Sequence, residues 1–323
     1  MNTAAAFYAA VIYFTLQDQG HSMRTGKLER IFYWKEETAG EEHLRTLEKA
    51  YNKIFYELPE AGTKEPQTLE GILENALKDS DPMDCLLITS RDARIHLAEK
   101  WNLATAAYPN PAIPGQSLFE ADVLIESFED VDLEYLERIR RRHHGIPWLI
   151  AQTKRCILRE ICMEDMQALF DLYAEPGMTD YIEPLYPWEQ ELEYEKSYIE
   201  HMYRLYEYGM WVVIEKDTGK LIGRAGLEHR EYPKEERLEE TDKDMELEMG
   251  YAIGTAYQRK GYATEVCRAI IAYAGQNLDY PRINCLIEKE NTASIRFIES
   301  IGFTFVGESK AAGTTMLRYV KEI

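Results

Sequence analysis

The most regular pattern of polar and apolar positions lies in the second half of the chain. Residues 246–253 alternate between polar and apolar side chains, which predicts a β-strand. Residues 265–274 carry apolar side chains at helical spacing, and residues 282–287 form another strand-like apolar run. A short turn with two cations and a glycine, Gln258-Arg-Lys-Gly261, joins the first strand to the helix. The pattern therefore predicts a strand that leads through a polar turn into a helix N-terminus.

The preceding part of the second half reads as alternating strands and helices around one aromatic loop. The segment 217–219, Asp-Thr-Gly, predicts a hairpin with a positive φ at Gly219. The expected elements are strands at 156–161, 211–216 and 220–229, helices at 164–175 and 188–208, a Pro- and aromatic-rich loop at 176–187, and an acidic loop at 232–243.

In the first half the pattern changes along the chain. Residues 24–75 have helical spacing. Shorter apolar runs follow and alternate with helical segments, which predicts a small parallel sheet with crossover helices. The helical stripe comprises Leu44, Leu47, Tyr51, Ile54 and Phe55, and the later elements are strands at 84–89, 104–108 and 121–125 with helices at 93–101 and 133–143.

The chain starts with an apolar stretch at residues 4–16. It has no positive segment before it and no clear cleavage site, which argues against a signal peptide. It is also too short to span a bilayer. We expect a buried first helix or strand and no membrane association, with Met23 as a plausible alternative start.

Composition is that of a globular protein of two domains. The 323 residues carry a formal net charge of −20, and residues 1–152 hold 16 Lys and Arg against 25 Asp and Glu. Because neither half is basic, nucleic-acid binding is not expected. The five cysteines form no C-x-x-C pair, which favours a reducing cytoplasm and predicts neither a disulfide framework nor a metal site. We place the domain boundary between 1–152 and 153–323.

The turn before the 265–274 helix has the chemistry of an anion receptor. Unpaired N–H groups at a helix N-terminus bind phosphate groups, helped by the helix dipole. Gly261 lets the main chain approach the anion, and Arg259 and Lys260 add charge-assisted contacts. A polar turn of this kind also occurs in many other α/β proteins, so further motifs are needed.

Two such motifs follow, Asn291-Thr-Ala-Ser294 and Gly302-Phe303. With the Gln258–Ala263 turn they resemble the GNAT family of acyl-CoA-dependent N-acetyltransferases, in particular its branch that modifies ribosomal proteins. The resemblance covers about residues 154–323. It implies a mixed, mainly antiparallel sheet and acetyl-CoA as co-substrate. The residues that it assigns to the cofactor are Ala252, Ile253, Gln258, Arg259, Lys260, Gly261, Tyr262, Ala263, Thr264, Asn291 and Ser294.

The family resemblance implies direct attack of an amine on the thioester, without an acyl-enzyme. Backbone groups of Ala252 and Ile253 would pair with the pantetheine arm. Glu246, Glu248 and Gly250 share one strand face, and we take Glu248 as the first candidate for the base and Glu246 as the second. Many relatives carry a tyrosine as the acid at a position that is Ile298 here, so a water, another tyrosine or no acid serves.

Residues 84–150 resemble part of a haloacid-dehalogenase-type phosphatase domain. Ser90-Arg91 replaces that family's metal-binding Asp, with Asp92 the nearest acid, and no Asp-x-Asp pair stands upstream. A phosphoryl-transfer site needs such carboxylates. We therefore expect a non-catalytic α/β domain in the first half, with an active phosphatase as the alternative.

The sequence thus favours an N-acetyltransferase that moves the acetyl group of acetyl-CoA to a primary amine. The acceptor is either a small molecule or a peptide or protein N-terminus, and segments 176–187 and 232–243 are expected to select it. The alternative is a catalytically silent CoA-binding module with a protein-docking first domain. The oligomeric state stays open.

Overall fold

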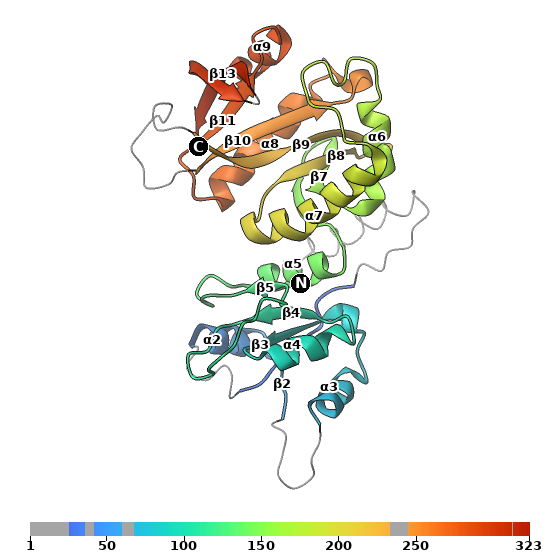
Figure 1. Cartoon of the computed structure of the whole chain (residues 1–323), viewed down its shortest axis with the longest axis vertical. Helices are drawn as coiled ribbons and strands as arrows, with labels where there is room; N and C mark the ends of the chain where they lie inside the picture. Colours follow the sequence, from blue (N-terminus) through green and yellow to red (C-terminus); the bar gives the residue numbers. More distant parts are fainter. Residues whose placement is uncertain (1–25, 36–41, 60–67, 233–244, 312) are drawn as a thin grey trace. The chain divides into compact units, whose positions relative to one another are not determined.

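The computed structural model describes residues 26–35, 42–59, 68–232, 245–311 and 313–323. The chain divides between Trp148 and Leu149 into two compact units, which are coloured blue to green and green to red in Figure 1. The apolar start at 4–16, and the acidic loop beyond Tyr232, lie outside the described residues. No helix within the described ranges is long and apolar enough to cross a membrane.

The first unit contains a five-stranded, wholly parallel sheet of order β2-β1-β3-β4-β5. Its strands β3 and β4 are buried along their whole length, as expected when helices cover both faces of a parallel sheet. This confirms the small parallel sheet predicted for this half. Its elements are β1 (Arg30–Tyr33), α2 (Glu42–Ala50), β2 (Phe55–Glu57), α3 (Leu69–Leu77), the 3-10 helix η1 (Pro82–Asp84), β3 (Cys85–Thr89), α4 (Asp92–Glu99), β4 (Ala104–Ala107), β5 (Val123–Leu124) and α5 (Leu133–His143).

The prediction of helix across residues 24–75 was wrong in two places, because β1 and β2 lie there. Residues 31–34 are all buried, and such a short, continuously apolar run suits a strand with both faces covered. Of the predicted helical stripe, Leu44 and Leu47 lie on α2, whereas Phe55 begins β2. Tertiary burial therefore overrode the helical spacing.

The second unit contains an eight-stranded sheet of order β12-β13-β11-β10-β9-β8-β7-β6. Only β10 and β11 run parallel, which confirms the predicted mixed, mainly antiparallel sheet. The elements are β6 (Leu149–Gln152), β7 (Cys156–Glu160), the 3-10 helix η2 (Met163–Asp165), α6 (Met166–Tyr173), α7 (Trp188–Tyr206), β8 (Met210–Glu215), β9 (Leu221–Glu231), β10 (Met245–Ile253), the 3-10 helix η4 (Thr255–Tyr257), α8 (Tyr262–Asn277), β11 (Arg282–Ile287), α9 (Thr292–Ser300), β12 (Thr304–Ala311) and β13 (Thr314–Glu322).

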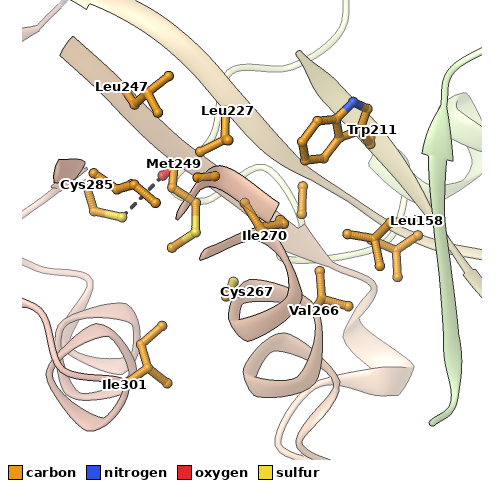
Figure 2. Close-up of a cluster of buried hydrophobic side chains, with 14 of the residues drawn as sticks. Leu158, Trp211, Leu227, Leu247, Met249, Val266, Cys267, Ile270, Cys285 and Ile301 are labelled. Atoms are coloured by element: carbon orange, nitrogen blue, oxygen red, sulfur yellow. Dashed lines mark hydrogen bonds between the residues drawn. The ribbon is translucent and has the colours of Figure 1, made fainter. Parts of the chain in front are cut away.

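Helices cover both faces of this sheet. Figure 2 shows Val266 and Ile270 of α8 pointing at the apolar side chains of the central strands, among them Trp211 and Leu247. On the other face, Glu195 of α7 forms an ion pair of 2.6 Å with Arg224 of β9. The sheet is therefore held between α8 on one side and α7 on the other.

Two details differ from the sequence-based expectation. Strand β6 pairs with β7, so residues 149–152 belong to the second unit although the sequence placed them at the end of the first. The hairpin of β12 and β13 was not anticipated, because polar side chains interrupt its apolar positions. The predicted hairpin at Gly219 is present with a φ of +69°.

Candidate functional site

The central strands β10 and β11 separate shortly after they meet. They pair at only two positions, where Leu247 faces Ile283 and Glu248 faces Asn284. Beyond that point β11 continues to pair with β13, and β10 continues to pair with β9. Among the strands that the structure describes, none therefore lies beside one edge of the second half of β10.

The register decides which backbone groups face this open edge. Gly254 donates its N–H to the Ile222 oxygen on the β9 side at 2.8 Å. In an antiparallel ladder successive residues alternate in direction, so Ala252 also faces β9, whereas Tyr251 and Ile253 face the open edge. The sequence had given backbone contacts to both Ala252 and Ile253. By this register the backbone groups of Tyr251 and Ile253 face the open edge, and Ala252 still belongs to the residues that line the site.

The open edge of β10 leads directly into the turn before α8. Gly261 has a φ of +82° and Arg259 a φ of +57°, and no side chain caps the N-terminus of α8. Glu265 donates the first intrahelical N–H, to the Gly261 oxygen, so the N–H groups of residues 262–264 have no acceptor within the helix. The Gln258 amide donates to the Ile253 oxygen at 3.0 Å and ties the turn to the strand.

Two residues from earlier parts of the domain, Arg155 and Glu215, hold this turn in place. The Arg155 guanidinium donates to the Lys260 oxygen at 3.0 Å and lies over the Tyr262 ring at 4.0 Å. Glu215, at the end of β8, accepts hydrogen bonds from the hydroxyls of Tyr262 and, at 3.5 Å, Tyr257. These hydroxyls lower the pKa of Glu215, and the same bond raises the pKa of Tyr262 to about 12.

A cavity of about 410 Å³ lies over the turn and the open edge. Its walls come from four stretches, the loop at 177–182, the end of β10, the turn at 257–264 and the start of α9. Nine of the eleven residues that the sequence assigned to the cofactor line it, and Lys260 and Tyr262 do not. Tyr262 instead points into the protein and is only 8% exposed.

Asn291 and Ser294 lie at the start of α9 and have different roles there. The Asn291 side chain accepts the Ser294 N–H at 3.1 Å and so caps the helix. The Ser294 side chain faces the cavity beside Tyr251 and Phe297, two lining residues that sequence reasoning had not selected. Side chains alternate between the two faces of a strand, so with Glu248 on one face of β10 the sequence predicts Tyr251 on the other. This pattern could have identified Tyr251 as a candidate from the sequence.

The two candidate bases are not among the residues that line the cavity. Glu248 pairs with Arg230 at 2.9 Å. Burial raises the pKa of Glu248, and the Arg230 charge opposes this shift. Glu246 accepts hydrogen bonds from Asn284 at 2.9 Å and Arg318 at 3.0 Å. Glu248 is thus the carboxyl with a raised pKa, and Glu246 belongs to a polar network between β10, β11 and β13.

In the first unit, the residues that follow β1 and β3 serve the packing of this domain. Trp34, which follows β1, is fully buried under the Arg94 guanidinium at 3.7 Å. Asp92, the acid nearest to the end of β3, accepts the N–H groups of Ser117 and Leu118.

The second unit thus offers the groups that a nucleotide thioester needs. The uncapped N–H groups of α8, together with Arg259, suit a diphosphate. The open edge of β10 suits an extended chain with amide groups, which can pair with it as a strand does. The residues present therefore fit coenzyme A.

Comparison with known proteins agrees with this geometry. Residues 155–304 match the family model described as acetyltransferase (GNAT) domain. The uncharacterized N-acetyltransferase YoaA of Bacillus subtilis is 29% identical over 159 residues, which is 48% of this chain and 82% of that protein. The uncharacterized N-acetyltransferase p20 of Bacillus licheniformis is 27% identical over 154 residues, 47% of this chain and 80% of that protein.

Among solved structures, a GNAT-family acetyltransferase from Bacillus anthracis has 22% identity and a TM-score of 0.42, with 55% of this chain and 98% of that chain covered. The acetyltransferase from Salmonella typhimurium that modifies the N-terminal serine of ribosomal protein L7/L12 has 16% identity and a TM-score of 0.45, with 55% and 99% covered. The family assignment rests on the sequence matches. The C-terminal half of the chain is therefore an acetyltransferase domain of the GNAT family.

Proposed function

We propose that the C-terminal domain transfers the acetyl group of acetyl-CoA to a primary amine by direct attack of the amine. The observation that carries this proposal is the continuity of the cavity, which joins the open edge of β10 to the uncapped N-terminus of α8. The end of the cavity at β10 suits a thioester, and the end at the N-terminus of α8 suits a diphosphate. Acetyl-CoA supplies the activated acetyl group.

The roles of the chain's own residues follow from their placement. The Ile253 N–H faces the open edge and would polarise the thioester carbonyl, which stabilises the negative charge that develops on its oxygen. The N–H groups at 262–264, with Arg259, would hold the diphosphate. The side chains of Thr264 and Ser294, which also belong to the cavity lining, would contact the arm of the cofactor.

For the amine, Glu248 is our first candidate for the group that removes its proton, and Glu246 is the second. Burial raises the pKa of Glu248, and this is the direction of shift that a carboxylate base needs. Because Glu248 does not line the cavity, we propose that the proton reaches it through water. The acceptor is a small-molecule amine or a peptide or protein N-terminus, and the loop at 177–182, which forms one wall of the cavity, would select it.

Thiol release from acetyl-CoA, measured with the full chain against a panel of small amines and of peptides with free N-termini, tests the proposal. We expect amine-dependent release and an acetylated product detected by mass spectrometry. Tight CoA binding without turnover on any acceptor would instead support the alternative, a catalytically silent CoA-binding module. Acetylation of peptides but not of small amines would identify the acceptor class.

We further propose that the first unit is a non-catalytic domain and that the protein works in a reducing cytoplasm. Ser90-Arg91 stand where the resembled phosphatases carry a metal-binding Asp, and Asp92, the nearest acid, accepts the N–H groups of Ser117 and Leu118. All five cysteines are free and buried, which suits a compartment that keeps thiols reduced. Mg²⁺-dependent hydrolysis of a generic phosphomonoester by the full chain would contradict the first of these proposals.

A further inference from the structure

Two glutamates lie directly opposite each other on the face of the sheet that carries α7. The antiparallel register of β9 and β10 pairs Glu228 with Glu248, our first candidate for the base. Residues paired in this way point to the same face of a sheet, and like charges in this arrangement repel each other. The pair therefore destabilises the sheet by itself, and a cation beside it would remove that repulsion.

Glu228 is the member of this pair whose charge is not compensated. Glu248 forms an ion pair with Arg230 at 2.9 Å, and Arg224, a further arginine of β9, pairs with Glu195 at 2.6 Å. Glu228 is exposed, and among the residues that the structure describes neither a hydrogen bond nor an ion pair engages its carboxylate. Its charge is therefore available to a cation that comes from a ligand.

An exposed aromatic ring of α7 lies near this carboxylate. Tyr194 is 44% exposed, and its ring packs against those of Tyr186 and Tyr198 with centroids 5.7 and 6.1 Å apart. Burial raises the pKa of Tyr194, and the negative charge of Glu228 raises it further, as expected for neighbouring side chains. A carboxylate beside an aromatic ring is a combination that binds ammonium groups.

The same face of β10 leads from the open edge to this pair of glutamates. Ala252, Gly250 and Glu248 occupy every second position of the strand, so all three lie on that face. Gly250 has no side chain, and a Cβ added there would meet the Met210 side chain at 3.4 Å. Strand β10 thus places no side chain of its own between Ala252 and Glu248, and the neighbour at this level is a flexible thioether.

We propose that the acceptor carries a second positive charge, which binds between the Glu228 carboxylate and the Tyr194 ring while the reacting amine lies at the thioester. This inference rests on the function proposed above and names the acceptor class, an amine with a second ammonium group. Two residues along a strand span roughly 7 Å, so about four or five methylene groups would join the two nitrogen atoms. The second charge comes from a diamine or from a basic side chain next to a peptide N-terminus.

The ratio of kcat/KM between a diamine and a monoamine of equal length tests the proposal. Butane-1,4-diamine and pentylamine differ only in that a methyl group replaces one ammonium group. We expect the full chain to prefer the diamine by about tenfold, and Glu228→Gln to remove this preference by lowering kcat/KM for the diamine. Equal kcat/KM for the two amines in the wild type, or an unchanged ratio in Glu228→Gln, would overturn the proposal.

Peptides provide the same comparison for the other source of the second charge. Peptides with lysine or leucine as the second residue differ in that charge, and the substrate pair whose ratio depends on Glu228 identifies the source. An influence of Glu228 on the base does not disturb this test. Burial raises the pKa of Glu248 and the Glu228 charge raises it further, but this effect applies to both amines and cancels in the ratio.

Glu231→Gln is the matched control. Glu231 is exposed and lies on β9 three residues after Glu228, so its side chain points to the other face of the sheet. This variant loses the same charge and should keep the wild-type ratio. Tyr194→Leu should lower the ratio about threefold, whereas Tyr194→Phe, which keeps an aromatic ring, should retain it. Equal ratios in the leucine and phenylalanine variants would remove the ring from the site.

Stability and turnover separate the remaining outcomes. Because Glu228 is exposed and repels Glu248, Glu228→Gln should not lower the melting temperature, so its loss of diamine preference would not reflect unfolding. If the wild type acetylates no amine and no peptide, the proposed function and this inference fail together. If it acetylates both members of each substrate pair with equal kcat/KM, this inference alone fails.

Discussion

The Glu265 carboxylate accepts two hydrogen bonds from Arg155, one from its backbone N–H at 2.6 Å and one from its Nε at 2.8 Å. Arg155 precedes β7, and Glu265 lies in the first turn of α8. The same guanidinium reaches the Lys260 oxygen through its other end. This pair therefore fixes the start of α8 against the first strands of the domain and so sets the direction of the helix's free N–H groups.

Arg155 should matter for the affinity of acetyl-CoA more than for stability. The side chains of Arg155 and Glu265 are 34% and 18% exposed, so their ion pair is partly screened by solvent. We expect Arg155→Ala to raise the KM for acetyl-CoA about tenfold, because the turn loses its anchor. Arg155→Lys should raise it as well, since a lysine cannot contact both Glu265 and Lys260. An unchanged KM in both variants, measured by thiol release, would contradict this role.

Gly261 allows the turn to approach the diphosphate. A Cβ at this position meets only Arg155, at 3.5 Å, so the protein should stay folded with a branched side chain there. We expect Gly261→Val to weaken CoA binding by about 100-fold in calorimetry, because the side chain blocks two or three N–H contacts.

Gly313 provides the control for backbone strain. Its φ is +80°, close to that of Gly261, and a Cβ there meets nothing within 4 Å. Gly313→Val carries the same conformational cost of about 1–2 kcal/mol but lies outside the cavity. Its CoA affinity should equal that of the wild type. Equal affinity in both glycine variants would remove the turn from the binding site.

The carboxyl of Glu248 should set the acid side of the pH–rate profile. Below its raised pKa, Glu248 is protonated and accepts no proton, so kcat/KM for the amine falls as the pH decreases. Burial raises this pKa and Glu228 raises it further, while Arg230 and Arg318 oppose the shift. We therefore expect Arg230→Met to move the acid limb to higher pH, and Glu248→Gln to lower kcat/KM about 100-fold.

Glu246→Gln separates the two candidate bases. Glu246 bonds to Asn284 and Arg318, which hold it within the polar network of the sheet. We expect Glu246→Gln to keep the acid limb where the wild type has it. An acid limb that shifts in Glu246→Gln and not in Arg230→Met would make Glu246 the base instead.

A buried ion pair stabilises the start of the C-terminal domain. The Arg159 guanidinium donates to both oxygens of Asp165 at 2.7 Å, and the two side chains are 2% and 0% exposed. Removing one charge leaves the other buried without compensation. We expect Asp165→Asn to lower the free energy of unfolding by about 3–5 kcal/mol in urea denaturation. Asp171→Asn is the control, because it affects only an exposed hydrogen bond between Asp171 and Gln167, which both lie on α6. This variant should change the free energy of unfolding by less than about 0.5 kcal/mol.

The chain's alternating patterns were enough to predict the parallel sheet of the first unit from β3 onward, because each strand there is a short apolar run between helices. They were misleading for Ile31 and Phe55, which lie in β1 and β2. Helical spacing and a fully buried strand look alike over a few residues, since both place apolar side chains close together. Only the neighbours in the sheet decide between them.

For the site, the local sequence determined the turn and the helix that follows it. Gly261 and the apolar spacing of α8 are properties of one continuous segment, so they could be predicted from it. The remainder was decided by the tertiary structure. The separation of β10 from β11, the direction of the Ile253 N–H, and the place of Tyr251 in the cavity wall depend on strand register and on side chains that are distant in sequence. No local pattern encodes those contacts, because they exist only once the sheet is assembled.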